Sequence, residues 1–328
     1  MTGSSAEVTP VHERPDFIRE SVWRHLDERT EPPEVELIRH RHGILEYRFA
    51  GGRRVFAKPF TDLDKAPAAY EIQRALWEGG FGTASEHRVP EPIAFRPGEC
   101  VILMAPAPGE QVRELATGDW TTWADALEGA ARWLAALHAS SHRLGPHDDA
   151  ARRARNLARR VAQTAARRPD VERLLTILLD ELATQIPARP AKDKVQTHGR
   201  YHPQHVYVSP DCVMVIDADR ATPGDAAKDV GEFLHRLRAD AMSSGTGAEA
   251  ADRASETFVH EYVRRGGADL LGLAFYWSYS ILFTLVARAR RTSADDLDER
   301  GRIEFYEAEF AAVPGRVAAF GSKAGGKT

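Results

Sequence analysis

The sequence contains little cysteine: Cys100 and Cys212 are the two among 328 residues. They lie far apart and form no Cys-x-x-Cys pair, so the chain lacks the ligand spacing of a zinc site. A chain of this length can bury a core without the help of a disulfide. We therefore expect two reduced thiols in a protein of the reducing cytoplasm.

A strong excess of charge of either sign is also absent, with 44 Lys and Arg against 48 Asp and Glu and a net charge of −4. This balance argues against a dedicated binder of nucleic acid or of anionic membranes. The first ten residues have neither the basic nor the apolar region of a secretory signal.

Long apolar runs are rare, and residues 270–287, which contain no charge for 18 residues, form the one stretch to test as a membrane span. This length is near the lower limit for crossing a bilayer. The stretch also holds Gly, Ser, Tyr and Thr, and no second candidate accompanies it. It therefore predicts a buried helix in a large helical lobe, and we expect no membrane partner.

The hydrophobic pattern changes once along the chain. Within a first lobe over 15–104, residues 34–104 are predicted to form short strands separated by His-Gly and Gly-Gly breaks, with a hairpin at 50–52 and a helix over 66–78. Residues 105–320 show helical periodicity, with a break at Pro169 and an embedded hairpin over 206–217. This order predicts an α+β fold with a strand-rich lobe, a helical lobe and flexible tails at 1–14 and 321–328.

Polar residues gather at both ends of the embedded hairpin. A β-hairpin places its two flanking segments side by side, so we expect one site to include His202, His205, Asp217 and Asp219. Carboxylates at the exit of a strand suit a hard cation such as Mg²⁺.

The segments HGRYHPQHVYV and VMVIDADRATPGDAAKDV resemble the core of the aminoglycoside phosphotransferase/choline-kinase-like family, and the resemblance extends over residues 34–290. It implies a two-lobed protein-kinase-like fold, in which a small antiparallel sheet with one helix binds ATP. Lys58 is placed like the lysine that holds the ATP phosphates, and Glu71 like its ion-pair partner. The resemblance further implies that the adenine lies near Met104, Ala105 and Ala107.

The chain departs from the family pattern in its catalytic loop. Arg200 replaces the aspartate that orients the acceptor, and His205 replaces the metal-binding asparagine. Asp217 is retained and is followed by Asp219, so the resemblance implies Mg²⁺ on Asp217 with His205. The region around His42 and Gly43 is poor in glycine, which leaves the phosphate-covering loop unrecognisable.

Several residues keep two interpretations. Arg200 either clamps a phosphate or an anionic acceptor, or pairs with Asp217 or Asp219 and closes the site. His202 either replaces the missing base or bonds backbone groups within the loop. Asp217 is either a metal ligand or the partner of Arg200 or Lys58. Asp229 is placed to cap the helix that follows it.

The Arg-rich helix over 152–168 is either a solvated face or lines the path of an anionic substrate. A catalytic group of Arg200, His202 and Asp219 would transfer phosphate from ATP to a hydroxyl of an aminoglycoside-, sugar- or natural-product-like molecule or of a short peptide. The alternative is a pseudokinase that binds a nucleotide, a ligand or a partner protein. A third hypothesis is that the protein transfers a nucleotidyl group instead of the γ-phosphoryl group.

Overall fold

The computed structural model describes residues 13–26, 33–40, 43–187, 194–292 and 297–324. Residues 1–12 and 325–328, which belong to the predicted tails at 1–14 and 321–328, lie outside the described residues, as does His42 in the region searched for the phosphate-covering loop. The chain divides into two compact units. The first comprises Met1–Gly109 and Ser209–Asp219, and the second comprises Glu110–Val208 and Arg220–Thr328.

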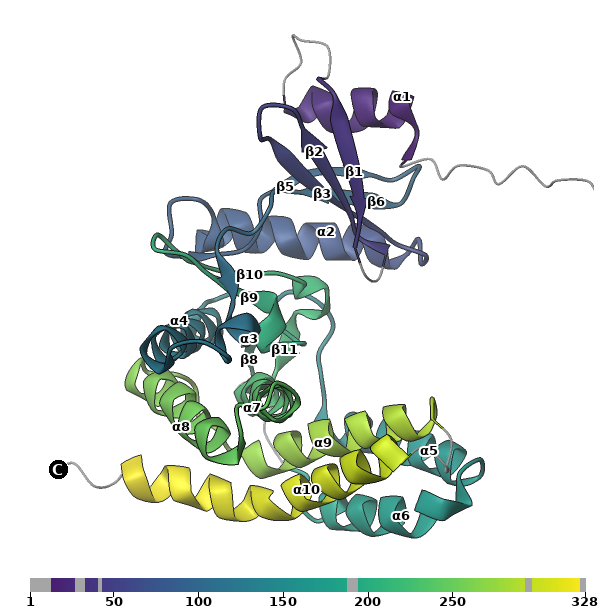
Figure 1. The fold of residues 1–328 in the computed structure, drawn as a ribbon, viewed down its shortest axis with the longest axis vertical. Coiled ribbons are helices and arrows are strands. Elements are labelled where there is room, and N and C mark those ends of the chain that lie inside the picture. The colour runs from purple at the N-terminus through teal and green to yellow at the C-terminus, as the bar shows by residue number, and fades with distance from the viewer. Residues whose placement is uncertain (1–12, 27–32, 41–42, 188–193, 293–296, 325–328) are drawn as a thin grey trace, which may run out of the picture. The chain divides into compact units, whose positions relative to one another are not determined.

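The first unit is built on an antiparallel sheet of five strands in the order β1-β2-β3-β6-β5 (Figure 1). The strands are β1 Val35–Arg39, β2 Leu45–Phe49, β3 Arg54–Pro59, β5 Pro92–Arg96 and β6 Val101–Met104. The predicted hairpin at 50–52 is confirmed, because β2 and β3 pair on either side of it. Apolar residues alternate in β2, so Leu45, Tyr47 and Phe49 are buried.

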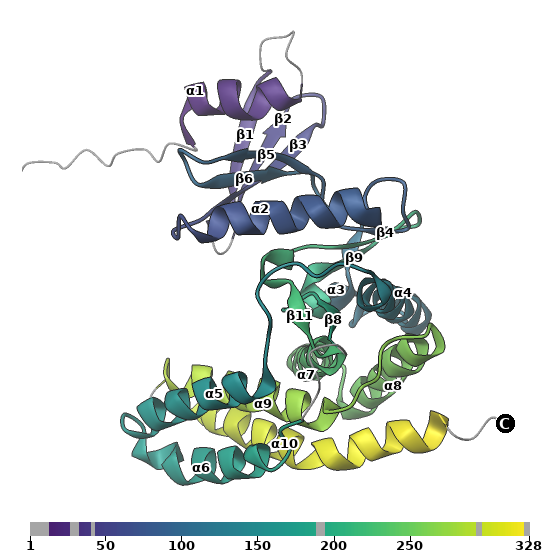
Figure 2. The ribbon, with the colours of Figure 1, turned by 180° about the vertical axis from the view of Figure 1, so that it is seen from behind.

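Helices cover both faces of this sheet (Figures 1 and 2). On one face α1 Pro15–Phe17 continues into the helical turns Ile18–Val22 and Trp23–His25. The apolar side chains of these three segments pack in one core with those of β2. The sequence analysis did not predict this segment. The other face is covered by α2 Lys65–Leu76, in which Tyr70 stacks on Phe95 of β5 at 5.6 Å between ring centroids.

A short segment from later in the chain completes the first unit. Strand β10 Val213–Val215 pairs in parallel with β4 His87–Arg88, and the amide of Val213 donates to the carbonyl oxygen of Glu86 at 2.8 Å. This pairing brings the residues after β10 into the first unit. Cys100 and Cys212 are both buried free thiols, as predicted.

The second unit is mainly helical, with α7 packed against α8 and α9, and α4 packed against α8. Its helices are α3 Val112–Leu115, α4 Trp120–Ala139, α5 Ala150–Ala165, α6 Pro169–Ala183, α7 Ala226–Ser243, α8 Ala248–Arg264, α9 Leu273–Ala289 and α10 Leu297–Ala324. The predicted break at Pro169 is confirmed, since Pro169 begins α6. Helix α10 continues to Ala324, so placing the start of the C-terminal tail at Gly321 was wrong.

Two small pairs of strands carry the loops of the second unit. Strand β8 Val195–Thr197 pairs antiparallel with β11 Thr222–Gly224, and β7 Glu110–Gln111 pairs antiparallel with β9 Val206–Val208. The apolar stretch over 270–287 forms most of α9, whose aromatic side chains Phe275, Tyr276 and Trp277 are buried. None of the helices in the described part of the chain combines the length and the apolar character needed to cross a membrane.

Candidate active site

Lys58 is the centre of the site in the first unit. Strand β3 places it opposite Ile102 of β6, and its Nζ donates to Oδ1 of Asp217 at 2.5 Å and to a carboxylate oxygen of Asp219. Its side chain is 18% exposed. Burial alone would lower the pKa of Lys58, but the two carboxylates outweigh it and raise that pKa. Lys58 therefore remains a cation.

Asp217 reaches Lys58 through an unusual backbone conformation. Its φ is +68°, in the left-handed region that few residues other than glycine adopt. Asp tolerates this region better than most residues because its short polar side chain bonds locally. Asp219 follows in the turn Ala218–Arg220, where the buried Ala218 holds the segment in place. Strain of this kind is concentrated at functional sites.

The predicted pair between Lys58 and Glu71 is not formed in this structure. Glu71 lies on the exposed face of α2, where its carboxylate accepts from Arg74 at 2.5 Å. The buried face of α2 is instead formed by residues such as Ile72 and Gln73, and Gln73 donates to the carbonyl oxygen of Pro90 at 2.7 Å. The helix rotation that buries these residues turns Glu71 outward.

The predicted hinge residues lie at the end of β6, which includes Met104, and directly after it within the first unit. Met104, Ala105 and Ala107 are all half-buried. The amide of Ala105 donates to the carbonyl oxygen of Glu91 at 3.0 Å, which fixes the backbone just after the strand.

The carboxylates of Asp217 and Asp219 fit a divalent metal ion in their chemistry. Both already converge on one cationic group, the Lys58 ammonium. Within the described residues no three His, Cys, Asp or Glu side chains cluster as a metal site. Two carboxylates nevertheless match Mg²⁺, which is usually bound by one or two carboxylates together with substrate phosphates and water.

The catalytic-loop segment lies in the second unit and is held through its backbone. Asp229 of α7 accepts from the amides of His198 at 2.6 Å and Gly199 at 2.9 Å. Gly199 has a φ of +85°, and a Cβ at this position would overlap the carbonyl oxygen of Arg220. Only glycine fits here.

Asp229 does not cap α7, so the prediction of a cap was wrong. Its carboxylate is fully buried and bonds the loop, and it also accepts from Nε2 of His138 at 3.3 Å. Burial alone would raise the pKa of Asp229, but the bond and the charge of His138 outweigh it and leave the pKa lowered. The carboxylate of Asp229 is thus a fixed negative charge beneath the loop.

His202 is oriented by a carboxylate that the sequence analysis missed. Its Nε2 lies 2.9 Å from Oε1 of Glu232 on α7, so this nitrogen carries the proton and donates. Its Nδ1 lies 3.5 Å from Nε2 of Gln204. The ring is 2% exposed, and its orientation is fixed at both nitrogens.

His205 stacks on His202, with ring centroids 4.8 Å apart. Its Nδ1 donates to the backbone oxygen of Arg200 at 3.0 Å, because a carbonyl only accepts. In the neutral ring this leaves the lone pair on Nε2, which lies 3.3 Å from Nε2 of Gln204. Metal-binding histidines commonly donate their second nitrogen to a backbone carbonyl in this way.

A network of buried charges lies beside the loop in the second unit. Oδ2 of Asp148 accepts from Nε of Arg153 at 2.5 Å and pairs with Nζ of Lys228 at 3.2 Å. Lys228 precedes Asp229 on α7, so the network is continuous with the support of the loop. No sequence motif marks these residues. Asp148 and Lys228 lie far apart in the sequence, and the fold brings their opposite charges together.

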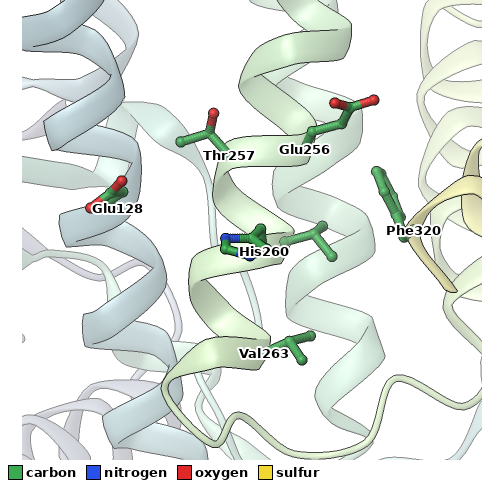
Figure 3. A pocket seen from close by; sticks show the side chains of 7 residues that line it. Glu128, Glu256, Thr257, His260, Val263 and Phe320 are labelled. Atoms are coloured by element: carbon green, nitrogen blue, oxygen red, sulfur yellow. The ribbon is translucent and has the colours of Figure 1, made fainter. Parts of the chain in front are cut away.

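A cavity of about 330 Å³ opens elsewhere in the second unit (Figure 3). Its lining comes from α4, α8 and α10: Glu128, Glu256, Thr257, Val259, His260, Val263 and Phe320. The predicted site residues are not among them, so this cavity is separate from the residues described above.

The sheet that carries Lys58 and the helical unit that carries the histidine loop define a protein-kinase-like fold. Within that class, a sequence model of the phosphotransferase enzyme family matches residues 37–276, and the chain belongs to this family. None of the curated proteins compared with the chain matches it.

Solved structures support the same fold. The aminoglycoside-3'-phosphotransferase of type VIII is 24% identical, with a TM-score of 0.56 over 81% of this chain and 99% of that one. Choline kinase LicA from Streptococcus pneumoniae is 14% identical, with a TM-score of 0.59 over 90% of this chain and 98% of that one. The amicoumacin kinase hAmiN in complex with AMP-PNP, Ca²⁺ and Ami is 12% identical, with a TM-score of 0.60 over 90% and 94%.

Proposed function

We propose that this protein uses ATP and a divalent metal ion to phosphorylate a hydroxyl group of a small molecule in the cytoplasm. The carboxylates of Asp217 and Asp219 favour Mg²⁺ as this ion. The observation that carries the proposal is the bond of Lys58 to both Asp217 and Asp219. One lysine for the phosphates and one or two carboxylates for the metal are the charged groups that phosphoryl transfer requires. Both kinds of group are present in the first unit of this chain.

In this proposal Lys58 contacts the phosphates of ATP, whose adenine lies near Met104, Ala105 and Ala107. Asp217 and Asp219 of the same unit would hold the metal ion. The metal neutralises charge on the phosphates. The acceptor oxygen would bond to the γ-phosphorus as the bond between the γ-phosphorus and ADP breaks, and the hydroxyl proton would pass to solvent water. The similar structures support a small acceptor, since these proteins are named as phosphotransferases or kinases of aminoglycosides, macrolides, choline and amicoumacin.

The experiment is a thermal-shift titration with ATP in the presence and absence of Mg²⁺. A ligand that binds the native state raises its Tm by mass action. We expect a Mg²⁺-dependent rise in the wild type and its loss in Asp217→Ala. Asp211→Ala is the matched control, because Asp211 is an exposed carboxylate of the same short segment. The proposal fails if the wild type shows no shift at saturating ATP.

Arg200 favours a second candidate, a pseudokinase that binds a nucleotide or a partner without turnover. A positive charge stands where the family places the aspartate that orients the acceptor, and general bases contribute about 10²–10⁴-fold. Substitution Arg200→Asp separates the two candidates. Under our proposal Arg200 has a positive role and phosphoryl transfer falls. A large gain of activity would instead identify Arg200 as the lesion of a degenerate kinase.

A further inference from the structure

Helix α5 is strongly basic. It carries Arg152, Arg153, Arg155, Arg159 and Arg160 and has no acidic residue. Two of these arginines, Arg153 and Arg160, are seven positions apart and therefore share one face of the helix. This face packs towards α9.

Helix α9 presents a row of aromatic rings to these arginines. Phe275, Tyr279 and Phe283 follow one another at intervals of four residues, with centroids 6.1 and 6.0 Å apart. The guanidinium carbon of Arg153 lies 5.8 Å from the centre of the Tyr279 ring, and that of Arg160 lies 5.1 Å from the centre of Phe283. Tyr279 and Phe283 thus each hold one arginine in a cation–π contact.

A guanidinium on an aromatic ring keeps N–H donors along its edge, in the geometry that carboxylates and phosphates prefer. Arg153 is further fixed by Asp148, yet its side chain remains 26% exposed. Arg160 is exposed, and within the described ranges of the chain it forms no ion pair. The face formed by Arg153, Arg160, Tyr279 and Phe283, here called the α5–α9 face, is therefore basic and partly aromatic.

Bonds within the second unit connect this face to the catalytic loop. Arg153 shares the carboxylate of Asp148 with Lys228, which lies at the start of α7. One turn further along α7, Glu232 bonds His202 of the loop at 2.9 Å. The charge of Glu232 also acts on Arg153 and contributes to its raised pKa, although burial opposes it.

We propose that the acceptor is an anion: a hydroxylated small molecule that carries a carboxylate or phosphate and a flat apolar surface, bound on the α5–α9 face. This inference rests on the proposed function and names the substrate class of that same site. The guanidinium group of Arg160, together with that of Arg153, repels a polycationic aminoglycoside and attracts an anionic group. The rings of Tyr279 and Phe283 add a surface on which a flat ligand packs.

The test compares two probes that differ in one charge, 4-nitrophenyl β-D-glucuronide and 4-nitrophenyl β-D-glucoside, titrated by calorimetry without nucleotide. We expect the glucuronide to bind at least about tenfold more tightly than the glucoside and kanamycin to bind more weakly still. In Arg160→Gln, which leaves Asp148 and its partners untouched, the preference falls by about tenfold. Arg155→Gln, an exposed arginine of the same helix, keeps the preference. Arg153→Gln provides a second, independent variant.

Equal titration curves for the two glycosides, including the absence of binding by either, would overturn the anionic acceptor class, as would tighter binding of kanamycin. The nucleotide shift is measured separately. A lost Mg²⁺–ATP shift with a retained glucuronide preference overturns the proposed function and leaves the anion site standing. A retained shift with no preference overturns the acceptor class alone.

Discussion

The ammonium group of Lys58 lies 2.5 Å from Oδ1 of Asp217 and also bonds Asp219. The group proposed for the nucleotide phosphates and the groups proposed for the metal therefore neutralise one another in the free protein. Loading of ATP with its metal ion must exchange this contact: the phosphates replace the carboxylates on Lys58, and the metal replaces Lys58 on the carboxylates. The contact of Lys58 with Asp217 and Asp219 holds the ammonium group and the two carboxylates in place until ATP and the metal ion bind.

Replacing Lys58 by Met should make the free protein bind Mg²⁺ more tightly in the absence of nucleotide. The two carboxylates then lose their internal cation, and we expect the Kd for Mg²⁺ alone to fall by roughly tenfold, or about 1.4 kcal/mol. Calorimetry measures this directly. Lys65→Met is the control, since Lys65 forms an exposed pair with Asp62 at 2.5 Å. An unchanged Kd would show that Lys58 does not compete with the metal.

The motif HGRYHPQH with IDAD, together with the strand pattern before it, was enough to predict the fold class, because local spacing and strand patterns carry that information. The pair of Lys58 with Asp217 was one of the alternatives considered for Asp217, whereas the failure of Glu71 to pair with Lys58 was not predictable from spacing. Glu71 has the family's position, but the rotation of α2 is set by burial of Ile72 and Gln73 and turns Glu71 towards Arg74. The left-handed conformation of Asp217 likewise has no signal in the sequence.

The residues that hold the catalytic loop were not predicted correctly, for a related reason. Asp229 begins a helical pattern, which favours a capping role, yet the fold brings the backbone of His198 and Gly199 onto its carboxylate. The roles of Glu232 and Asp148 depend on their contacts with His202 and Lys228, which lie more than twenty-five positions away in the sequence. Such contacts arise from packing of α7 against the loops, which hydrophobic periodicity does not encode.

Removing the negative charge of Asp229 should destabilise the second unit. In Asp229→Asn the amides of His198 and Gly199 lose a charged acceptor in a fully buried position, and we expect a loss of about 2–4 kcal/mol in the free energy of unfolding. Urea denaturation measures it. Asp240→Asn on the same helix is the matched comparison: burial raises the pKa of Asp240, so neutralising it should cost little. Equal losses in both variants would contradict the role given to Asp229.

Acid should weaken the protein through Asp148. Burial alone would raise its pKa, but Lys228 and Arg153 outweigh it and lower the pKa from 3.8 to about 2. Lys228 itself keeps a lowered pKa, because burial and the nearby Arg153 outweigh the attraction of Asp148. A carboxyl whose pKa is lower in the folded state stabilises the fold above its unfolded pKa. This contribution, about 2 kcal/mol, is lost as the pH falls from about 4 to about 2.

The measurement is urea denaturation of the wild type and Asp148→Asn between about pH 5 and pH 2. The variant should have a lower free energy of unfolding than the wild type at the upper end of this pH range. The difference between the two proteins should shrink as the pH falls. Asp125→Asn, at an exposed position of α4, should keep the wild-type dependence. Parallel curves for Asp148→Asn and the wild type would rule out this carboxylate as a source of acid sensitivity.

Gly231 is a point of close approach between α7 and α9. A Cβ at this position would lie 2.7 Å from the backbone nitrogen of Trp277 and 3.0 Å from the carbonyl carbon of Tyr276. Alanine is the better helix former by about 1 kcal/mol. The clash is with backbone, however, so α7 and α9 must separate, and overpacking of this kind costs about 1–3 kcal/mol. We therefore expect Gly231→Ala to lower the free energy of unfolding despite its higher helix propensity. Gly301→Ala in α10, where nothing described lies within 4 Å of the added Cβ, should instead raise it. A stabilised Gly231→Ala would mean that α7 and α9 do not pack at this distance.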